Sequence, residues 1–233
     1  MIQIKFNAKK ILILMFSIVI LILLSNVIFF WLESKGVGSF HFNSLFYVNE
    51  ESNIPTYFSG LNLLFASIIT FIVGLRSDIS IKTTPVFWRL LSLLFLFLSF
   101  DEVAMFHERI YRVTVLFTDY FNTPLVWYVP YSLFAVVIIT ILWKNFMRLD
   151  FYTKVYMGAS GVIFLTGAIG LEHISNNCDS IFETKCTQFG LFGLSSLEET
   201  FEMISICLFN YATLKLFTGN YDHISIQIKR QNN

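Results

Sequence analysis

The sequence predicts an all-α protein: one polytopic membrane domain over residues 1–233, built as a bundle of six transmembrane helices with both termini in the cytoplasm. Three observations predict this fold class. The chain is 55% hydrophobic and 14% charged, with a mean hydropathy of +0.66, which is too apolar for a soluble domain of this size. Six apolar runs reach the roughly 20 residues that a helix needs to cross a hydrocarbon core. Lys and Arg gather beside alternate ends of these runs.

The six runs are expected to be helices because they are continuous stretches of Leu, Ile, Phe and Val, whereas a membrane barrel would show short alternating strands. The first run has a basic start, but it exceeds the apolar core of a signal peptide and no A-x-A site follows, so we interpret it as a retained helix. Pro55 and Pro124 stand at the start of the second and fourth runs, as is typical of a first helical turn. The expected helices lie near 11–32, 55–75, 86–107, 125–146, 154–173 and 195–217.

The distribution of basic residues predicts the orientation. Of the 16 Lys and Arg residues, only Lys35, Arg109, Arg112 and Lys185 fall on one side of the runs, so the positive-inside rule places both termini in the cytoplasm. The net charge is zero, and no charge excess indicates a nucleic-acid partner. The other twelve, on the expected cytoplasmic side, are Lys5, Lys9, Lys10, Arg76, Lys82, Arg89, Lys144, Arg148, Lys154, Lys215, Lys229 and Arg230.

The three cysteines divide between the two environments. Cys178 and Cys186 lie in the loop after the fifth run, on the expected non-cytoplasmic face, where an oxidising compartment would allow a disulfide. Without a C-x-x-C spacing, a structural staple is favoured over redox chemistry. Cys207 lies inside the sixth run and is interpreted as a small, buried apolar residue.

Acidic residues gather near the outer ends of the third, fifth and sixth runs. A charged side chain at the bilayer centre costs roughly 2.5 to 3.5 kcal/mol on insertion scales, so such acids are functional candidates. The helical rise of about 1.5 Å per residue brings the acids of the three helices to one layer just below the outer surface. These acids are Asp101, Glu102, Glu108, Glu172, Glu198, Glu199 and Glu202.

Helical angles narrow this set. At about 100° per residue, Asp101 and Glu108 share one stripe of the third helix, and His107 joins them only if the helix ends or bends before it. Glu202 is central among the acids of the sixth helix, and only one of Glu172 and His173 is expected to point inward.

Two of the acids have simpler interpretations. Ser196 as the N-cap of the sixth helix would place Glu199 at position N3 of a capping box. Glu102 and Arg109 are seven residues apart on one helix face, so the two side chains could form an ion pair.

Carboxylates with one or two imidazoles suit zinc, iron or manganese, so we expect a divalent-metal site. Asp101, Glu108 and Glu202 are the candidate catalytic residues, because a buried carboxylate could act as general base. The Glu-x-x-His pairing of di-metal bundles and the H-E-x-x-H zinc motif are both absent. The candidate metal ligands are Asp101, Glu102, His107, Glu108, Glu172, His173, Glu198 and Glu202.

Two other functions stay open. The acids could serve a cation or proton pathway, although a pathway needs two accessible ends and the acids gather only on the outer side. Alternatively, they could belong to an ion-pair network in a non-catalytic structural or accessory subunit of a membrane complex. The expected partners are accordingly membrane lipid and a membrane protein or a second copy of the chain.

Three motifs carry a resemblance to a family. Ser99-Phe100-Asp101-Glu102 with His107-Glu108, then Gly167-Ala168-Ile169-Gly170-Leu171-Glu172, then Leu197-Glu198-Glu199 with Glu202-Met203 are similar to motifs of a widespread group of uncharacterised bacterial multi-pass membrane proteins. The resemblance covers about residues 90 to 215. It implies a bacterial inner membrane, and therefore an acidic cluster that faces the periplasm.

A second comparison is with the membrane hydrolases that include alkaline ceramidases, whose zinc site uses three His and an Asp. This chain has only His107 and His173 near the layer, and so departs from that pattern. The expected function is that of an integral inner-membrane protein whose acidic and His site acts on a lipid or lipid-linked substrate.

Overall fold

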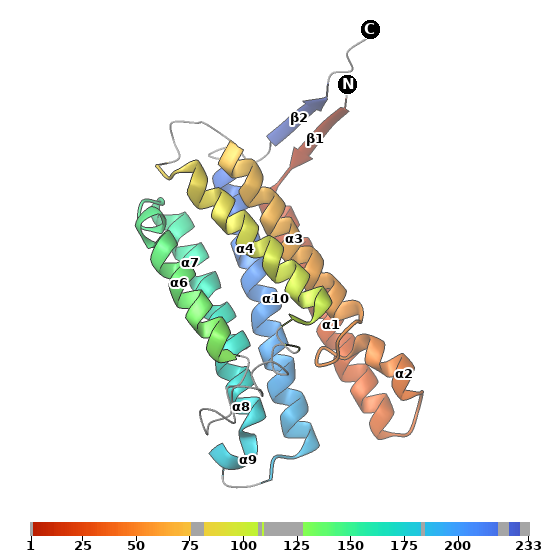
Figure 1. Ribbon diagram of the computed structural model, residues 1–233. Coiled ribbons are helices and arrows are strands. Elements are labelled where there is room, and N and C mark those ends of the chain that lie inside the picture. Colours follow the sequence, from red (N-terminus) through yellow and green to blue (C-terminus); the bar gives the residue numbers. More distant parts are fainter. Residues whose placement is uncertain are drawn as a thin grey trace.

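The computed structural model describes residues 2–75, 82–106, 109, 128–182, 185–218 and 224–228. Within these residues the chain is a bundle of helices, with one pair of short strands at the end opposite α8 and α9 (Figure 1). In chain order, the elements are β1 Ile2–Phe6, α1 Ala8–Ser34, α2 Phe40–Asn43, the 3₁₀ turn η1 Ser44–Phe46, α3 Ile54–Leu75, α4 Pro85–Ala104, α6 Tyr128–Phe146, α7 Phe151–Leu165, the π-helical segment η2 Thr166–Leu171, α8 Glu172–Asn176, α9 Cys178–Ile181, α10 Gln188–Thr218 and β2 Ile224–Ile228.

Three helices in the described part of the chain are long and apolar enough to cross a membrane. They are α1, α3 and the continuous helix Phe151–Asn176 that α7, η2 and α8 form together, while Pro130–Phe146 within α6 is apolar but shorter. The helix α4 is not among these three, and it carries three charged residues, Arg89, Asp101 and Glu102, within its 20 residues.

Two expected helix ends are wrong, and local conformation explains both. The helix expected over 86–107 ends at Ala104, because Met105 adopts a left-handed conformation with φ of 54°. The sixth helix begins at Gln188 rather than near 195: the Thr187 hydroxyl accepts a hydrogen bond from the Gly190 N–H (3.0 Å), as an N-cap does. Ser196 therefore lies inside α10, and the capping box expected with Glu199 does not form.

The core lies around α3, α4 and α10, and α10 contacts α1, α3 and α7. The helices α3 and α4 approach closely at Gly74, where an added Cβ would lie 3.0 Å from the Cβ of buried Trp88. The Ser67 hydroxyl donates to the Ser92 carbonyl (2.8 Å), which satisfies one buried hydroxyl between the two helices. Polar contacts extend to α10, where the Asn210 amide donates to the Asn62 side-chain oxygen of α3 (2.7 Å).

The terminal segments pair with each other, which the sequence analysis did not predict. β1 and β2 are antiparallel, with Ile2 opposite Ile228 and Phe6 opposite Ile224. The residues that begin and end the described chain therefore lie together (Figure 1).

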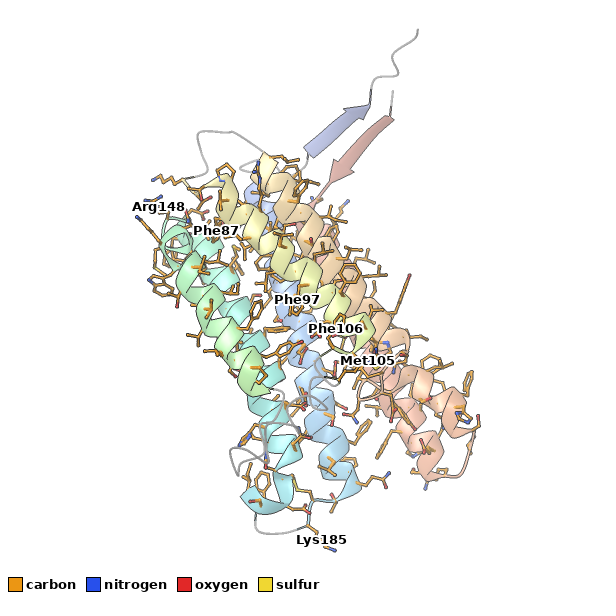
Figure 2. All side chains as sticks on the ribbon, in the orientation of Figure 1. Phe87, Phe97, Met105, Phe106, Arg148 and Lys185 are labelled. Carbon is orange, nitrogen blue, oxygen red and sulfur yellow. A yellow bond between two sulfur atoms is a disulfide. The ribbon has the colours of Figure 1, made fainter. Side chains whose placement is uncertain are left out.

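A disulfide joins Cys178 to Cys186 at the far end of the bundle, across a Cα separation of 6.1 Å. This confirms the expected staple. Cys207 is free and fully buried, as expected, and its sulfur also accepts a hydrogen bond from the Asn62 side-chain amide (3.4 Å). Figure 2 shows the side chains of the described residues on the ribbon, with Lys185 near this end of the molecule.

Candidate functional site

Asp101 lies in the last turn of α4 and is 6% exposed. Its Oδ1 accepts a hydrogen bond from the Tyr131 hydroxyl of α6 (2.8 Å). The end of α4 is held against α3 because the Ser99 hydroxyl donates to the Gly60 carbonyl (2.8 Å). Gly60 allows this approach, since an added Cβ there would lie 2.9 Å from Val103 Cγ2. Packing between α3 and α4 thus places a buried carboxyl where α6 can bind it.

The π-helical segment η2 brings the next acid to α10. Gly167 lies in this segment, and an added Cβ there would lie 3.0 Å from both the Glu198 carbonyl oxygen and Phe201 Cβ. Only a glycine permits so close an approach without a shift. Short π-helical segments within α-helices are found frequently at functional sites. The segment ends directly before Glu172, which is thereby carried to the side of α10.

Glu172 and Glu198 are in hydrogen-bond contact, and Glu202 lies electrostatically close to Glu198. Glu198 is 8% exposed, and Glu172 also accepts a hydrogen bond from the Asn176 amide (2.7 Å). A hydrogen bond between two carboxyls would require that one of them carries a proton. The two acids therefore form a close carboxyl pair.

A second group forms around Glu199 on the same helix. Its electrostatic neighbours are Glu202, Glu102, Glu198 and Glu51. Glu202 is thus close to both Glu198 and Glu199. We call Glu51, Asp101, Glu102, Glu172, Glu198, Glu199 and Glu202 the carboxylate layer.

Two expected site residues, His107 and Glu108, lie outside the described residues. The left-handed Met105 ends α4 at Ala104, so the stripe expected along this helix does not continue past that residue. The same break lies between Glu102 and Arg109. His173 is exposed on α8, with its Nδ1 3.3 Å from the Asn177 amide nitrogen.

The described residues contain no group of three or more His, Cys, Asp or Glu side chains arranged to hold a metal ion. The contacts given for Glu198 and Glu199 are with other acids, and His173 is exposed on α8. The described part of the layer is therefore a carboxyl network.

Three residues near the layer were missed by the sequence analysis. Asn26 of α1 is 1% exposed; its amide donates to the Ser196 hydroxyl (2.9 Å) and its oxygen accepts from the Val48 N–H (3.2 Å). Glu51 precedes α3, and its carboxylate accepts a hydrogen bond from Thr56 (3.3 Å). Tyr131 is the third. Asn26 could have been singled out from the sequence, because it is a polar residue within the apolar run 11–32. The roles of Glu51 and Tyr131 depend on tertiary contacts and could not.

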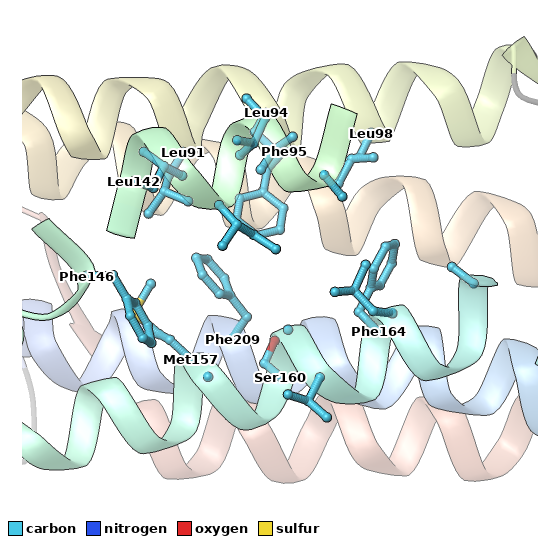
Figure 3. A pocket seen from close by; sticks show the side chains of 18 of the residues that line it. Leu91, Leu94, Phe95, Leu98, Leu142, Phe146, Met157, Ser160, Phe164 and Phe209 are labelled. Atoms are coloured by element: carbon cyan, nitrogen blue, oxygen red, sulfur yellow. The ribbon is translucent and has the colours of Figure 1, made fainter. Parts of the chain in front are cut away.

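An apolar cavity of about 430 Å³ lies between α4, α6, α7 and α10 (Figure 3). We call it the chamber. Tyr131 and Ser160 carry the hydroxyls on its wall, and Ala168 and Ile169 of η2 border it near Glu172. Tyr131 both borders the chamber and donates to Asp101, so the chamber reaches the carboxylate layer. The rest of the wall is formed by Phe87, Leu91, Leu94, Phe95, Leu98, Phe134, Ala135, Ile138, Ile139, Leu142, Trp143, Phe146, Met157, Gly158, Gly161, Val162, Phe164, Leu165, Ile206 and Phe209.

The fold and this site define a class: a helical protein with three helices able to span a membrane, a buried carboxyl network at one end and an apolar chamber beside it. Residues 12–216 match the model of the domain of unknown function DUF8692, and the chain belongs to this family. The match includes the layer and the chamber but neither strand. No curated protein and no solved structure matches the chain.

Proposed function

We propose that the chain is a multi-pass protein of the bacterial inner membrane with six spans, both termini in the cytoplasm and the carboxylate layer near the periplasm. The positive-inside rule supports this orientation. The Cys178–Cys186 disulfide lies at the end of the bundle opposite the strands, and disulfides persist in oxidising compartments such as the periplasm. A fluorescent protein that folds only in the cytoplasm, fused after residue 233, should fluoresce. A fusion without fluorescence would contradict the proposed orientation.

We further propose that the carboxylate layer is a site that acts on a lipid or lipid-linked molecule. One observation carries this proposal: Tyr131 borders the chamber and hydrogen-bonds the buried Asp101. A hydrocarbon chain in the chamber would end beside carboxyl groups. Ligand sites typically combine an apolar cavity of about 300 to 1,000 Å³ with a few convergent polar groups, and this arrangement has both.

The pair formed by Glu172 and Glu198 supports acid–base chemistry in this proposal. The two carboxyls lie close together, so a proton held by one can be donated while the other accepts one, as general acid–base catalysis requires. The proposal includes a divalent metal on the carboxylate layer, with zinc, iron or manganese as candidates. His107 and Glu108 would be further ligands of this metal.

Lipid analysis of purified protein tests the lipid site. The wild-type protein should retain a lipid that Asp101→Asn and Tyr131→Phe lose, because each change weakens the contact at the end of the chamber. Glu50→Gln is the matched control. Glu50 stands next to Glu51 in the sequence, but unlike Glu51 it is not among the acids that act electrostatically on Glu199. Identical retained lipid in all four proteins would refute the lipid proposal.

Metal analysis of the same preparations tests the metal separately. We expect one or more equivalents of a divalent metal in wild type and Glu50→Gln, and a loss in Asp101→Asn and Glu202→Ala. Wild-type protein without stoichiometric metal would remove the metal from the proposal and leave the lipid site standing.

A further inference from the structure

The chamber is a channel long enough for a hydrocarbon chain. Its wall on α6 runs from Tyr131 to Phe146, which corresponds to about 22 Å at the helical rise of 1.5 Å per residue. Its lining is apolar apart from the hydroxyls of Tyr131 and Ser160. An extended alkyl chain suits both this length and this lining.

The chamber also contains a hydroxyl that no described residue binds. Ser160 is 3% exposed, and its hydroxyl makes no hydrogen bond with the described residues. Figure 3 shows its side chain pointing into the chamber from α7, beside Phe164 and Phe209. Because this hydroxyl faces the apolar space of the chamber, it can hydrogen-bond a polar group of a ligand there. Ser160 lies nine residues before Ile169, or about 13 Å from the outer end of the chamber.

The chamber is accessible from the side of the bundle. Val162 of α7 and Trp143 of α6 both border it, and they are 67% and 54% exposed. Their exposed surfaces face the lipid in the proposed membrane orientation. A molecule dissolved in the bilayer can therefore enter beside α6 and α7 without crossing water.

The outer end of the chamber selects the charge of the head group. Tyr131 and Asp101 meet there, and Glu172 of α8 and Glu198 of α10 belong to the same carboxylate layer. A cationic head group complements these acids, whereas an anionic one would face like charges.

Resting on the lipid site proposed above, we propose that the chamber binds one chain of a single-chain amphiphile with a cationic amine head. The head lies at Asp101, and the chain carries an oxygen atom at the depth of Ser160.

Binding of radiolabelled octadecylamine to the full chain in phosphatidylcholine nanodiscs tests the chamber. Ser160→Leu fills the channel and should weaken binding more than tenfold. Ser160→Ala keeps the space, and should bind this saturated amine at least as tightly as wild type, because the probe offers the hydroxyl no partner. Gly193→Leu on α10 is the control, since an added Cβ there meets nothing within 4 Å and Gly193 lies outside the chamber.

Two further probes test the ligand chemistry. Stearate, with the same chain length and an anionic head, should bind more than tenfold more weakly than octadecylamine. An octadecylamine with a mid-chain hydroxyl should bind wild type about 2- to 12-fold more tightly than the unsubstituted amine, as one hydrogen bond contributes, and Ser160→Ala should lose this preference. Equal binding of stearate would overturn the cationic head group. A hydroxyl preference that persists in Ser160→Ala would overturn the oxygen atom proposed at the depth of Ser160.

The variants separate this inference from the lipid site. If Asp101→Asn weakens octadecylamine binding but Ser160→Leu does not, the chamber is not the chain site and the lipid site stands. If Ser160→Leu weakens it but Asp101→Asn and Tyr131→Phe do not, the chain site stands and the carboxylate site fails. Ser160→Leu counts as folded if it forms the disulfide and elutes as a single species. If it fails this check, Ala135→Leu replaces it, because this change blocks the chamber from the side of α6.

Discussion

Gly167→Ala should destabilise the protein, because the added Cβ would lie 3.0 Å from the Glu198 carbonyl oxygen and from Phe201 Cβ. Overpacking of this kind costs about 1 to 3 kcal/mol. Replacing a helical glycine by alanine returns about 1 kcal/mol, so the net destabilisation should be about 0 to 2 kcal/mol. The variant should also weaken the contact between Glu172 and Glu198, because η2 must move away from α10.

Gly170→Ala is the matched control for this change. Gly170 lies in the same π-helical segment, but its added Cβ would meet only Thr166 Cγ2, at 3.9 Å, which is an ordinary contact. This variant should gain up to about 1 kcal/mol from helix propensity. Thermal unfolding of both proteins in one detergent measures the difference, expected at about 1 to 3 kcal/mol, or roughly 2 to 12 °C in Tm. If Gly167→Ala unfolds at or above the temperature of Gly170→Ala, the inferred close approach of η2 and α10 is wrong.

Other predictions concern α1, the cysteines and the outer loop. Asn26→Ala should destabilise the protein by about 1 to 3 kcal/mol, more than Ser196→Ala, because it leaves two partners without hydrogen bonds; comparative unfolding checks the order. Maleimide should label no cysteine of the folded protein until the disulfide is reduced, and buried Cys207 only after unfolding; early labelling of Cys207 would contradict its burial. Burial first, and then the hydrogen bond to Glu33, raise the pKa of Tyr47 above its ordinary 10.0, so its neutral form stabilises the fold below that pH. Unfolding free energy should therefore fall as the pH rises above 10, and fall less in Tyr47→Phe; equal slopes would contradict the shift.

The helical fold could be predicted because it depends on local apolar runs. Five of the six expected helices begin within three residues of a helix in the described chain, as Ala8 and Phe151 show for the runs 11–32 and 154–173. The start of α10 was missed because the Phe-rich and Gly-rich stretch from Gln188 lacks the continuous apolar character of a span. The left-handed Met105 was also beyond prediction, since non-glycine residues rarely adopt that conformation.

The part of the candidate site that could be predicted depends on helix geometry, which is also a local property. Helical rise alone placed Glu172, Glu198 and Glu202 at one depth, and the structure brings these three together. Rise and angle cannot show which side chains meet across helices, so Tyr131 as the partner of Asp101 and the π-helical shift at Gly167 were not foreseen. The chamber depends on how far α6 stands from its neighbours, which no local pattern encodes.

The pairing of β1 with β2 bears on how the chain is made. Ile2 leaves the ribosome well before its partner Ile228, so this ladder cannot close until every helix between them has been made. Among the described residues it closes a very long loop, and such contacts form late. Protection of the β1 amides from hydrogen exchange would therefore report that insertion is complete, and a chain halted anywhere before residue 224 would leave its first strand open.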